Sequence, residues 1–200
     1  MAEKILIEIY KTKTPDELTK LIADPASRLE TGSGSAVVAA IAAALLERAA
    51  VLTGETVKDN ERVTYIIKNS EIIRSYMIHL IDEDVKSRGP LKRAMKEGGP
   101  REIEAARQPA VSICAEIVNM MGKCLELALE LAALCPEDAR HYLAESAETA
   151  MGASKSAARY IVDMSSKSSD ETYKYVTRRE NEITLDQYTK LHEEILEKTV

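Results

Sequence analysis

A run of small and aliphatic residues near the start of the chain constrains the fold more than any other feature. Residues 36–46 read AVVAAIAAALL and contain no polar side chain. Alanine and leucine are strong helix formers, and a helix that is apolar on every side must be buried. Small side chains also let neighbouring helices approach closely. We therefore predict an Ala-rich helix over residues 35–53, ended by Gly54, at the centre of a helical bundle.

Most of the remaining chain shows the apolar spacing of three and four residues that is typical of helices packed on one face. Further helices are predicted over residues 15–24, 58–86, 101–134 and 136–165, followed by two shorter ones in the tail. Gly89-Pro90 is expected to break the helix over 58–86, and Pro109 is a site for a kink in the next helix. The capping box Thr184-x-x-Gln187 is expected to begin the last helix.

The helix over residues 101–134 carries apolar residues on two sides. A helix of this kind contacts partners on both sides, so we expect it either at the centre of the bundle or at a subunit interface. Ile5, Ile7 and Ile9 alternate with other residues and predict a short strand or an extended arm. Together these patterns predict a single all-α domain over residues 1–200, an antiparallel bundle of about five to seven helices.

Composition and charge limit the functional classes. The 200 residues carry a formal net charge of −6 and show no basic stripe, which argues against a nucleic-acid partner. The apolar run of residues 36–52 is interrupted by Glu47 and Arg48, and it is shorter than the roughly 20 apolar residues of a membrane span. Residues 1–11 lack the apolar core of a secretory signal. We therefore expect a cytoplasmic protein without a membrane partner.

The residue types that hold metal ions are not grouped in the sequence. The three histidines are scattered and form neither an H-E-x-x-H motif nor paired Glu-x-x-His motifs. Cys114, Cys124 and Cys135 lack metal-ligand spacing, and their odd number suits a reducing compartment. We expect the cysteines to be buried apolar side chains and no metal to be bound.

A segment rich in glycine and serine precedes the Ala-rich helix and reads Leu29-Glu30-Thr31-Gly32-Ser33-Gly34-Ser35. The first N–H groups of a helix have no intrahelical partner and lie at the positive end of its dipole, so they can hold a ligand anion. Glycine also lets the backbone approach a ligand closely. These residues support two interpretations equally: a ligand-binding loop and an ordinary Ser-capped helix.

Asp84 is the strongest candidate for a catalytic residue. Met77, Leu80, Ile81 and Asp84 follow the spacing of one helix face, so an apolar stripe ends in a carboxylate. A carboxylate that loses hydration has a raised pKa unless it gains donors, and a raised pKa suits a general acid or base. The alternative is that the helix end leaves the core and Asp84 meets water. Asp82 and Glu83 point away from this face and are expected to be solvated.

Basic residues follow Asp84 and include Arg88, Lys92, Arg93 and Lys96. They suit an anionic substrate tail, although a solvated connector is the more frequent role of such residues. His141, next to Tyr142, is a candidate to face a cleft, although a lone histidine is more often a surface or packing residue.

The order of these pieces resembles the cyclodeaminase/cyclohydrolase family, which includes the C-terminal domain of formiminotransferase-cyclodeaminase and bacterial methenyltetrahydrofolate cyclohydrolases. Family members have a glycine-rich loop before an Ala-rich helix, and Thr31-Gly32-Ser33-Gly34-Ser35 occupies that place. A later helix ends in Leu-Ile-Asp-x-Asp, as does Leu80-Ile81-Asp82-Glu83-Asp84. Pro109 and the segment Lys167-Ser168-Ser169-Asp170 match further features. The resemblance covers residues 14–170.

The resemblance implies a dimeric, all-helical folate enzyme without a metal or organic cofactor. Such an enzyme hydrolyses 5,10-methenyltetrahydrofolate to 10-formyltetrahydrofolate, or releases ammonia from 5-formiminotetrahydrofolate. By position, Asp84 is the catalytic carboxylate. The implied substrate-binding residues are Gly32, Ser33, Gly34, Ser35, Asp82, Lys92, Arg93 and His141.

The chain also departs from the family pattern. Thr31 and Ser33 replace a proline and a glycine of the loop, and Val85-Lys86-Ser87-Arg88 replaces a small residue followed by an acid and an aromatic residue. A non-catalytic dimeric homologue that binds a small ligand or a partner protein is therefore the alternative function. A helical oligomerisation scaffold is a third hypothesis.

Overall fold

The computed structural model describes residues 9–200, and all of its regular secondary structure is helical. The helices are α1 (Pro15–Ala23), α2 (Thr31–Thr56), α3 (Glu61–Glu97), α4 (Pro100–Ala132), α5 (Glu137–Ser166) and α6 (Glu171–Thr199). The all-α prediction is confirmed. The arm predicted around Ile5 and Ile7 lies outside the described residues, and Ile9 has no regular secondary structure.

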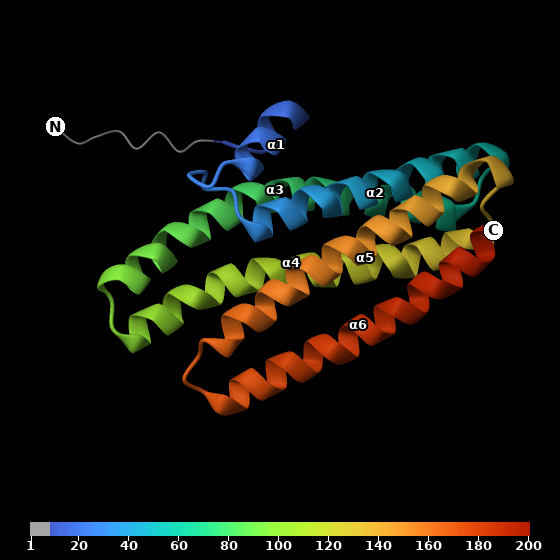
Figure 1. Cartoon of the computed structure of the whole chain (residues 1–200). Helices are drawn as coiled ribbons and strands as arrows, with labels where there is room; N and C mark the ends of the chain where they lie inside the picture. Colours follow the sequence, from blue (N-terminus) through green and yellow to red (C-terminus); the bar gives the residue numbers. More distant parts are fainter. Residues whose placement is uncertain (1–8) are drawn as a thin grey trace.

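Five long helices lie side by side in alternating directions, and the short α1 lies beside the N-terminal half of α2 (Figure 1). α2 packs against α3 and α5, whereas α6 covers α4 and α5. α4 contacts α2, α3, α5 and α6, so it lies inside the bundle. Both apolar sides of α4 are therefore covered within one chain, and they give no support for a subunit interface.

The Ala-rich helix buries one face in the core, whereas the prediction placed the whole helix at the centre of the bundle. Its alanines at positions 36, 39, 42, 43 and 49 have no exposed area. Among the described residues, α2 alone has the length and hydropathy to cross a membrane, and core helices of soluble proteins share these properties. The other face of α2 remains apolar and exposed, with Ile41 half exposed and Val38 and Val51 close to it in exposure.

α2 begins earlier than predicted. The residues expected to form a loop, Thr31 to Ser35, are its first turn, and the helix continues past Gly54 to Thr56. Neither Gly32 nor Gly34 has a positive φ, so both fit a helix. Because the first N–H groups of a helix need acceptors, a contact from another helix can stabilise this turn.

One further predicted boundary is wrong. α3 passes through Pro90 and ends only at Glu97. Pro90 is exposed, as is Lys86, whose carbonyl loses its usual N–H donor at this proline, so water can satisfy that carbonyl. α4 runs through Pro109, as the predicted helix over residues 101–134 does.

The tail forms one helix and not two, so no helix begins at Thr184. Asp170 caps α6 by accepting a hydrogen bond from the Tyr173 N–H at 3.0 Å. The ring of Tyr188 fills the space beside Gly122 of α4, where any side chain would overlap it. This contact and buried Ile195 hold the C-terminal half of α6 against the bundle.

Candidate active site around Asp84

The Asp84 carboxylate is fully buried and accepts four hydrogen bonds. Its Oδ2 accepts from the backbone N–H and the hydroxyl of Ser33, each at 2.8 Å. Its Oδ1 accepts from Nε and Nη2 of Arg88, each at 3.0 Å. Donors that reach both oxygens stabilise a buried carboxylate in its ionised form. The prediction that Asp84 continues the buried face of its helix is therefore confirmed.

The local sequence explains how this geometry arises. Asp84 and Arg88 are four residues apart on α3 and so lie on the same helix face. Gly32 of α2 lies against the carboxylate, and a Cβ at this position would overlap the carboxylate atoms of Asp84. The glycine is thus required for α2 and α3 to approach one another here.

The N-terminus of α2 already holds an anion. The sequence predicted a seat for a ligand carboxylate at this helix end, and in the structure the Asp84 side chain takes that place through the Ser33 N–H. The other predicted residues have different roles. Ser35 is buried and donates to the Ser156 hydroxyl at 3.0 Å, whereas a side chain at Gly34 would meet open space.

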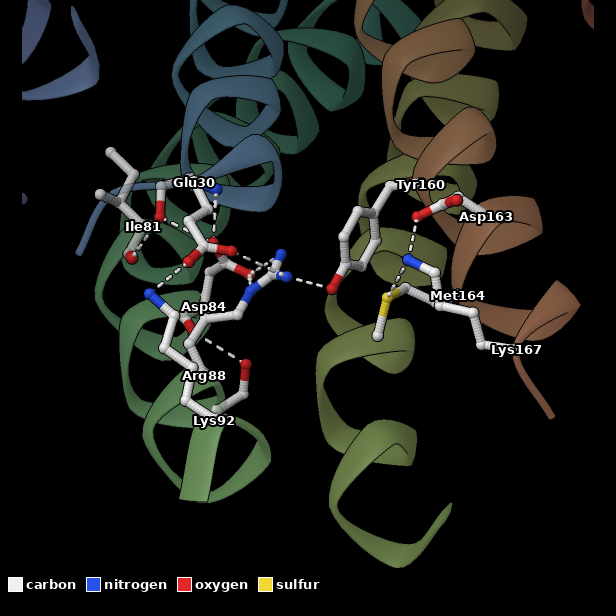
Figure 2. Close-up of polar contacts among 11 residues, drawn as sticks. Glu30, Ile81, Asp84, Arg88, Lys92, Tyr160, Asp163, Met164 and Lys167 are labelled. Atoms are coloured by element: carbon white, nitrogen blue, oxygen red, sulfur yellow. Dashed lines mark hydrogen bonds and ion pairs between the residues drawn. The ribbon is translucent and has the colours of Figure 1, made fainter. Parts of the chain in front are cut away.

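Arg88 connects Asp84 to two further groups. Its guanidinium donates a hydrogen bond to the Tyr160 hydroxyl and lies over the Tyr160 ring, 4.2 Å from the centroid. It also forms an ion pair with Glu30 at 3.3 Å. Figure 2 shows Tyr160 reaching from α5 towards Arg88, with Glu30 on the α2 side. We call Asp84, Arg88, Tyr160, Glu30 and Lys92 the Asp84 cluster.

Burial and the neighbouring charges shift the pKa values of Arg88 and Tyr160 in different directions. Burial opposes the charge of Arg88, but the nearby Asp84, Tyr160 and Glu30 outweigh it and raise the pKa of the guanidinium further. Burial also raises the pKa of Tyr160 to about 12, although Arg88 opposes that shift. Arg88 is therefore a permanent cation and Tyr160 a neutral hydroxyl at physiological pH.

Lys92 forms the exposed edge of the cluster. Its Nζ lies 2.6 Å from Glu30, and its side chain is largely exposed. The basic residues after Asp84 do not form a connector, because they all lie on the last turns of α3. Arg93 is exposed and makes no side-chain hydrogen bond or ion pair within the described part of the chain.

Residues 15–183 match the family model of formiminotransferase-cyclodeaminase. The chain belongs to this family. The fold is similar to the crystal structure of formiminotetrahydrofolate cyclodeaminase from Thermotoga maritima, with a TM-score of 0.85 and 17% identity over 94% of this chain and 96% of that chain. No curated protein sequence matches this one. The family resemblance seen in the sequence is confirmed.

Asp82, the other aspartate of the family motif, has a different environment from the one predicted. It is buried, not solvated, because its Oδ1 accepts hydrogen bonds from the backbone N–H of Tyr10 at 2.7 Å and of Lys11 at 3.3 Å. Asp82 thus holds the segment before α1 against α3. Glu83 is partly exposed and pairs with Lys86 at 2.7 Å.

His141 lies away from the Asp84 cluster. It is exposed and its ring lies 3.8 Å from that of Tyr142. The Tyr142 ring lies below Arg48 of α2, at 4.3 Å. Arg48 is 15 residues beyond Ser33, which is about 22 Å along a helix axis at 1.5 Å per residue. The structure therefore does not bring His141 together with Asp84.

Glu30 and Tyr160 of the cluster were not predicted from the sequence. Arg88 was grouped with an anion-binding connector, although its spacing from Asp84 indicates an ion pair. Tyr160 lies 72 residues from Arg88, and no local pattern connects them. Within the described residues, no three His, Cys, Asp or Glu side chains are grouped as a metal site.

Proposed function

We propose that this family member is a folate-dependent one-carbon enzyme and that Asp84 accepts a proton in its reaction. The reaction that the geometry favours is hydrolysis of 5,10-methenyltetrahydrofolate to 10-formyltetrahydrofolate. The observation that carries this choice is that every hydrogen-bond partner of the Asp84 carboxylate is a donor. Both oxygens act only as acceptors, which is the role of a carboxylate and not of a carboxylic acid, and a general base must begin the reaction in the carboxylate form.

Hydrolysis of the methenyl bridge requires a base. Water adds to the bridge carbon and loses a proton, which gives a hydroxyl adduct. The bond from the bridge carbon to N5 then breaks as N5 takes up a proton and the hydroxyl loses its proton to form the formyl group, so that one proton is released overall. A carboxylate within reach of the attacking water can take that proton. The Ser33 and Arg88 contacts fix the direction of the Asp84 oxygens, so a substrate must displace one of these donors to reach the carboxylate.

Cyclodeamination of 5-formiminotetrahydrofolate is the second reaction to consider. The Thermotoga relative carries the name of that activity. Release of ammonia requires a proton donor to the leaving nitrogen, and Asp84 would supply it only after receiving a proton. The donor-rich surroundings of Asp84 therefore favour hydrolysis over this reaction.

The first experiment follows the absorbance of 5,10-methenyltetrahydrofolate with the wild-type protein and with Asp84→Asn. We expect the protein to accelerate the loss of absorbance above the spontaneous rate, and the substitution to abolish the acceleration. Glu83→Gln is the matched control, because Glu83 is the next residue on α3 and lies outside the cluster. Ammonia release from 5-formiminotetrahydrofolate is measured with the same proteins.

A non-catalytic homologue is the alternative function. It is favoured by the complete burial of Asp84 and by the occupation of both its oxygens. Absence of both reactions at high protein concentration, together with folate binding, would establish this alternative.

We also propose a homodimer formed through the exposed apolar face of α2. Ile41 and Ile22 line an apolar groove of about 430 Å³ between α1, α2 and α3, and among residues 9–200 both side chains remain about half exposed. Ile41→Asp is expected to yield a monomer in light scattering. Ile183→Asp, on the exposed side of α6, is the control and leaves the dimer intact.

A further inference from the structure

The carboxylate of Glu30 is held by two cations of α3. Its Oε1 lies 2.6 Å from Lys92 Nζ and its Oε2 lies 3.3 Å from Arg88 Nη1. Glu30 is the N-cap residue of α2, yet its side chain caps no N–H group of that helix. Its contacts are therefore made with the two cations and not with the helix that it precedes.

The charges of the cluster balance only when an anion occupies this position. Arg88 and Lys92 contribute two positive charges, and Asp84 neutralises one of them. Tyr160 stays neutral, because burial raises its pKa to about 12. Lys167, which Figure 2 shows near Tyr160, is paired with Asp163 at 2.7 Å. Without Glu30 the cluster keeps one uncompensated positive charge.

Glu30 is the more accessible of the two anions of the cluster. Asp84 has no exposed area, whereas the side chains of Glu30 and Lys92 are 32% and 62% exposed. Glu30 also ends the connection between α1 and α2, so its side chain can turn into solvent without moving a helix. Arg88 stays in place when Glu30 leaves, because Asp84 and Tyr160 hold it independently.

We propose that Arg88 and Lys92 form a binding seat for a carboxylate group of a ligand, and that Glu30 fills this seat in the free protein. For a folate, this carboxylate belongs to the glutamate tail. That identification rests on the proposed function, whereas the seat itself rests on the charges and contacts of the cluster. Arg93, one residue from Lys92, lies outside the seat.

The test measures binding of p-aminobenzoyl-L-glutamate, which carries the tail but neither the pteridine ring nor the one-carbon unit. Calorimetry at low salt is expected to give a Kd about two- to fivefold lower for Glu30→Gln than for the wild-type protein, because the internal competitor is lost. Lys92→Gln is expected to raise the Kd by a similar factor. Arg93→Gln is the matched control and leaves the Kd unchanged.

A second probe separates the carboxylate from the rest of the ligand. With both carboxylates of the probe converted to amides, Glu30→Gln should no longer tighten binding. The proposal is overturned by an unchanged Kd in Glu30→Gln, by no binding to that variant, or by equal losses in Arg93→Gln and Lys92→Gln. If the protein is an active enzyme but gives any of these results, the proposed function stands and the proposed binding seat is rejected. If the protein is inactive but shows the expected binding pattern, the binding seat stands and the proposed function is rejected.

Discussion

The carboxylate of Asp84 occupies the space in which a side chain on Gly32 would begin. The consecutive helices α2 and α3 therefore meet at a point where α2 has no side chain and α3 has a charged one. The hydrogen bonds from Ser33 to the carboxylate depend on this close approach.

Gly32→Ala is expected to destabilise the protein by about 2–4 kcal/mol, because the added methyl group displaces a buried, paired carboxylate. Gly34→Ala is the matched control, since it adds the same group two residues away where there is open space. Its effect should be neutral or stabilising by up to about 1 kcal/mol, because alanine favours helix. Urea unfolding of the two variants checks this difference, and equal losses would contradict the contact.

Removal of one partner from the Asp84–Arg88 pair should cost more than removal of both. Arg88→Met leaves a buried carboxylate without its cation, and the expected loss of stability is about 3–5 kcal/mol. The double variant Asp84→Asn with Arg88→Met removes both charges and should recover part of that loss. A double-mutant cycle by denaturant unfolding measures the coupling. Additive losses would show that the two side chains do not interact.

Alkaline pH is expected to weaken the fold through Tyr160. Its pKa is about 12 in the folded protein and about 10 in an unfolded chain. Below pH 10 both states keep the proton, whereas between pH 10 and 12 only the unfolded state releases it, so stability falls as the pH rises. The loss at pH 11 is about 1 kcal/mol. Tyr160→Phe should lack this component in unfolding curves compared between pH 9 and pH 11.

The three cysteines are expected to resist thiol reagents in the folded protein. Cys114, Cys124 and Cys135 are free and buried. Burial raises the pKa of Cys114 and Cys124 to about 12 and raises that of Cys135 as well. Because the thiolate is the reactive form, a chromogenic disulfide at pH 8 should label few thiols before urea is added and three afterwards. Rapid labelling of one thiol without urea would show that its site opens readily.

Periodicity predicted the fold well where one helix face is buried continuously. The spacing of Met77, Ile81 and Asp84 predicted a carboxylate on the buried helix face, but it left open whether that end of the helix meets water. It could not show that Ser33 donates to that carboxylate, because Ser33 comes from another helix. The homodimer, the reaction and the substrate-binding residues remain predictions.

The wrong boundaries share a physical origin. Gly-Pro and capping-box signals describe what a segment prefers in isolation, and contacts elsewhere in the fold override such preferences. The first turn of α2 is stabilised by an anion supplied by α3, and Thr184 is kept inside α6 by the packing of Tyr188 against Gly122. Pro90 is tolerated because it faces solvent.

Asp82 and Asp84 lie two residues apart on α3 and point to opposite sides of the helix. Asp82 binds the backbone at Tyr10, and Asp84 binds the start of α2. A slip of α3 by a single residue would rotate both carboxylates by about 100° and break the two attachments together. This turn therefore locks the register of α3 along its axis, and insertions or deletions should be accepted only beyond it, towards the α3–α4 connection.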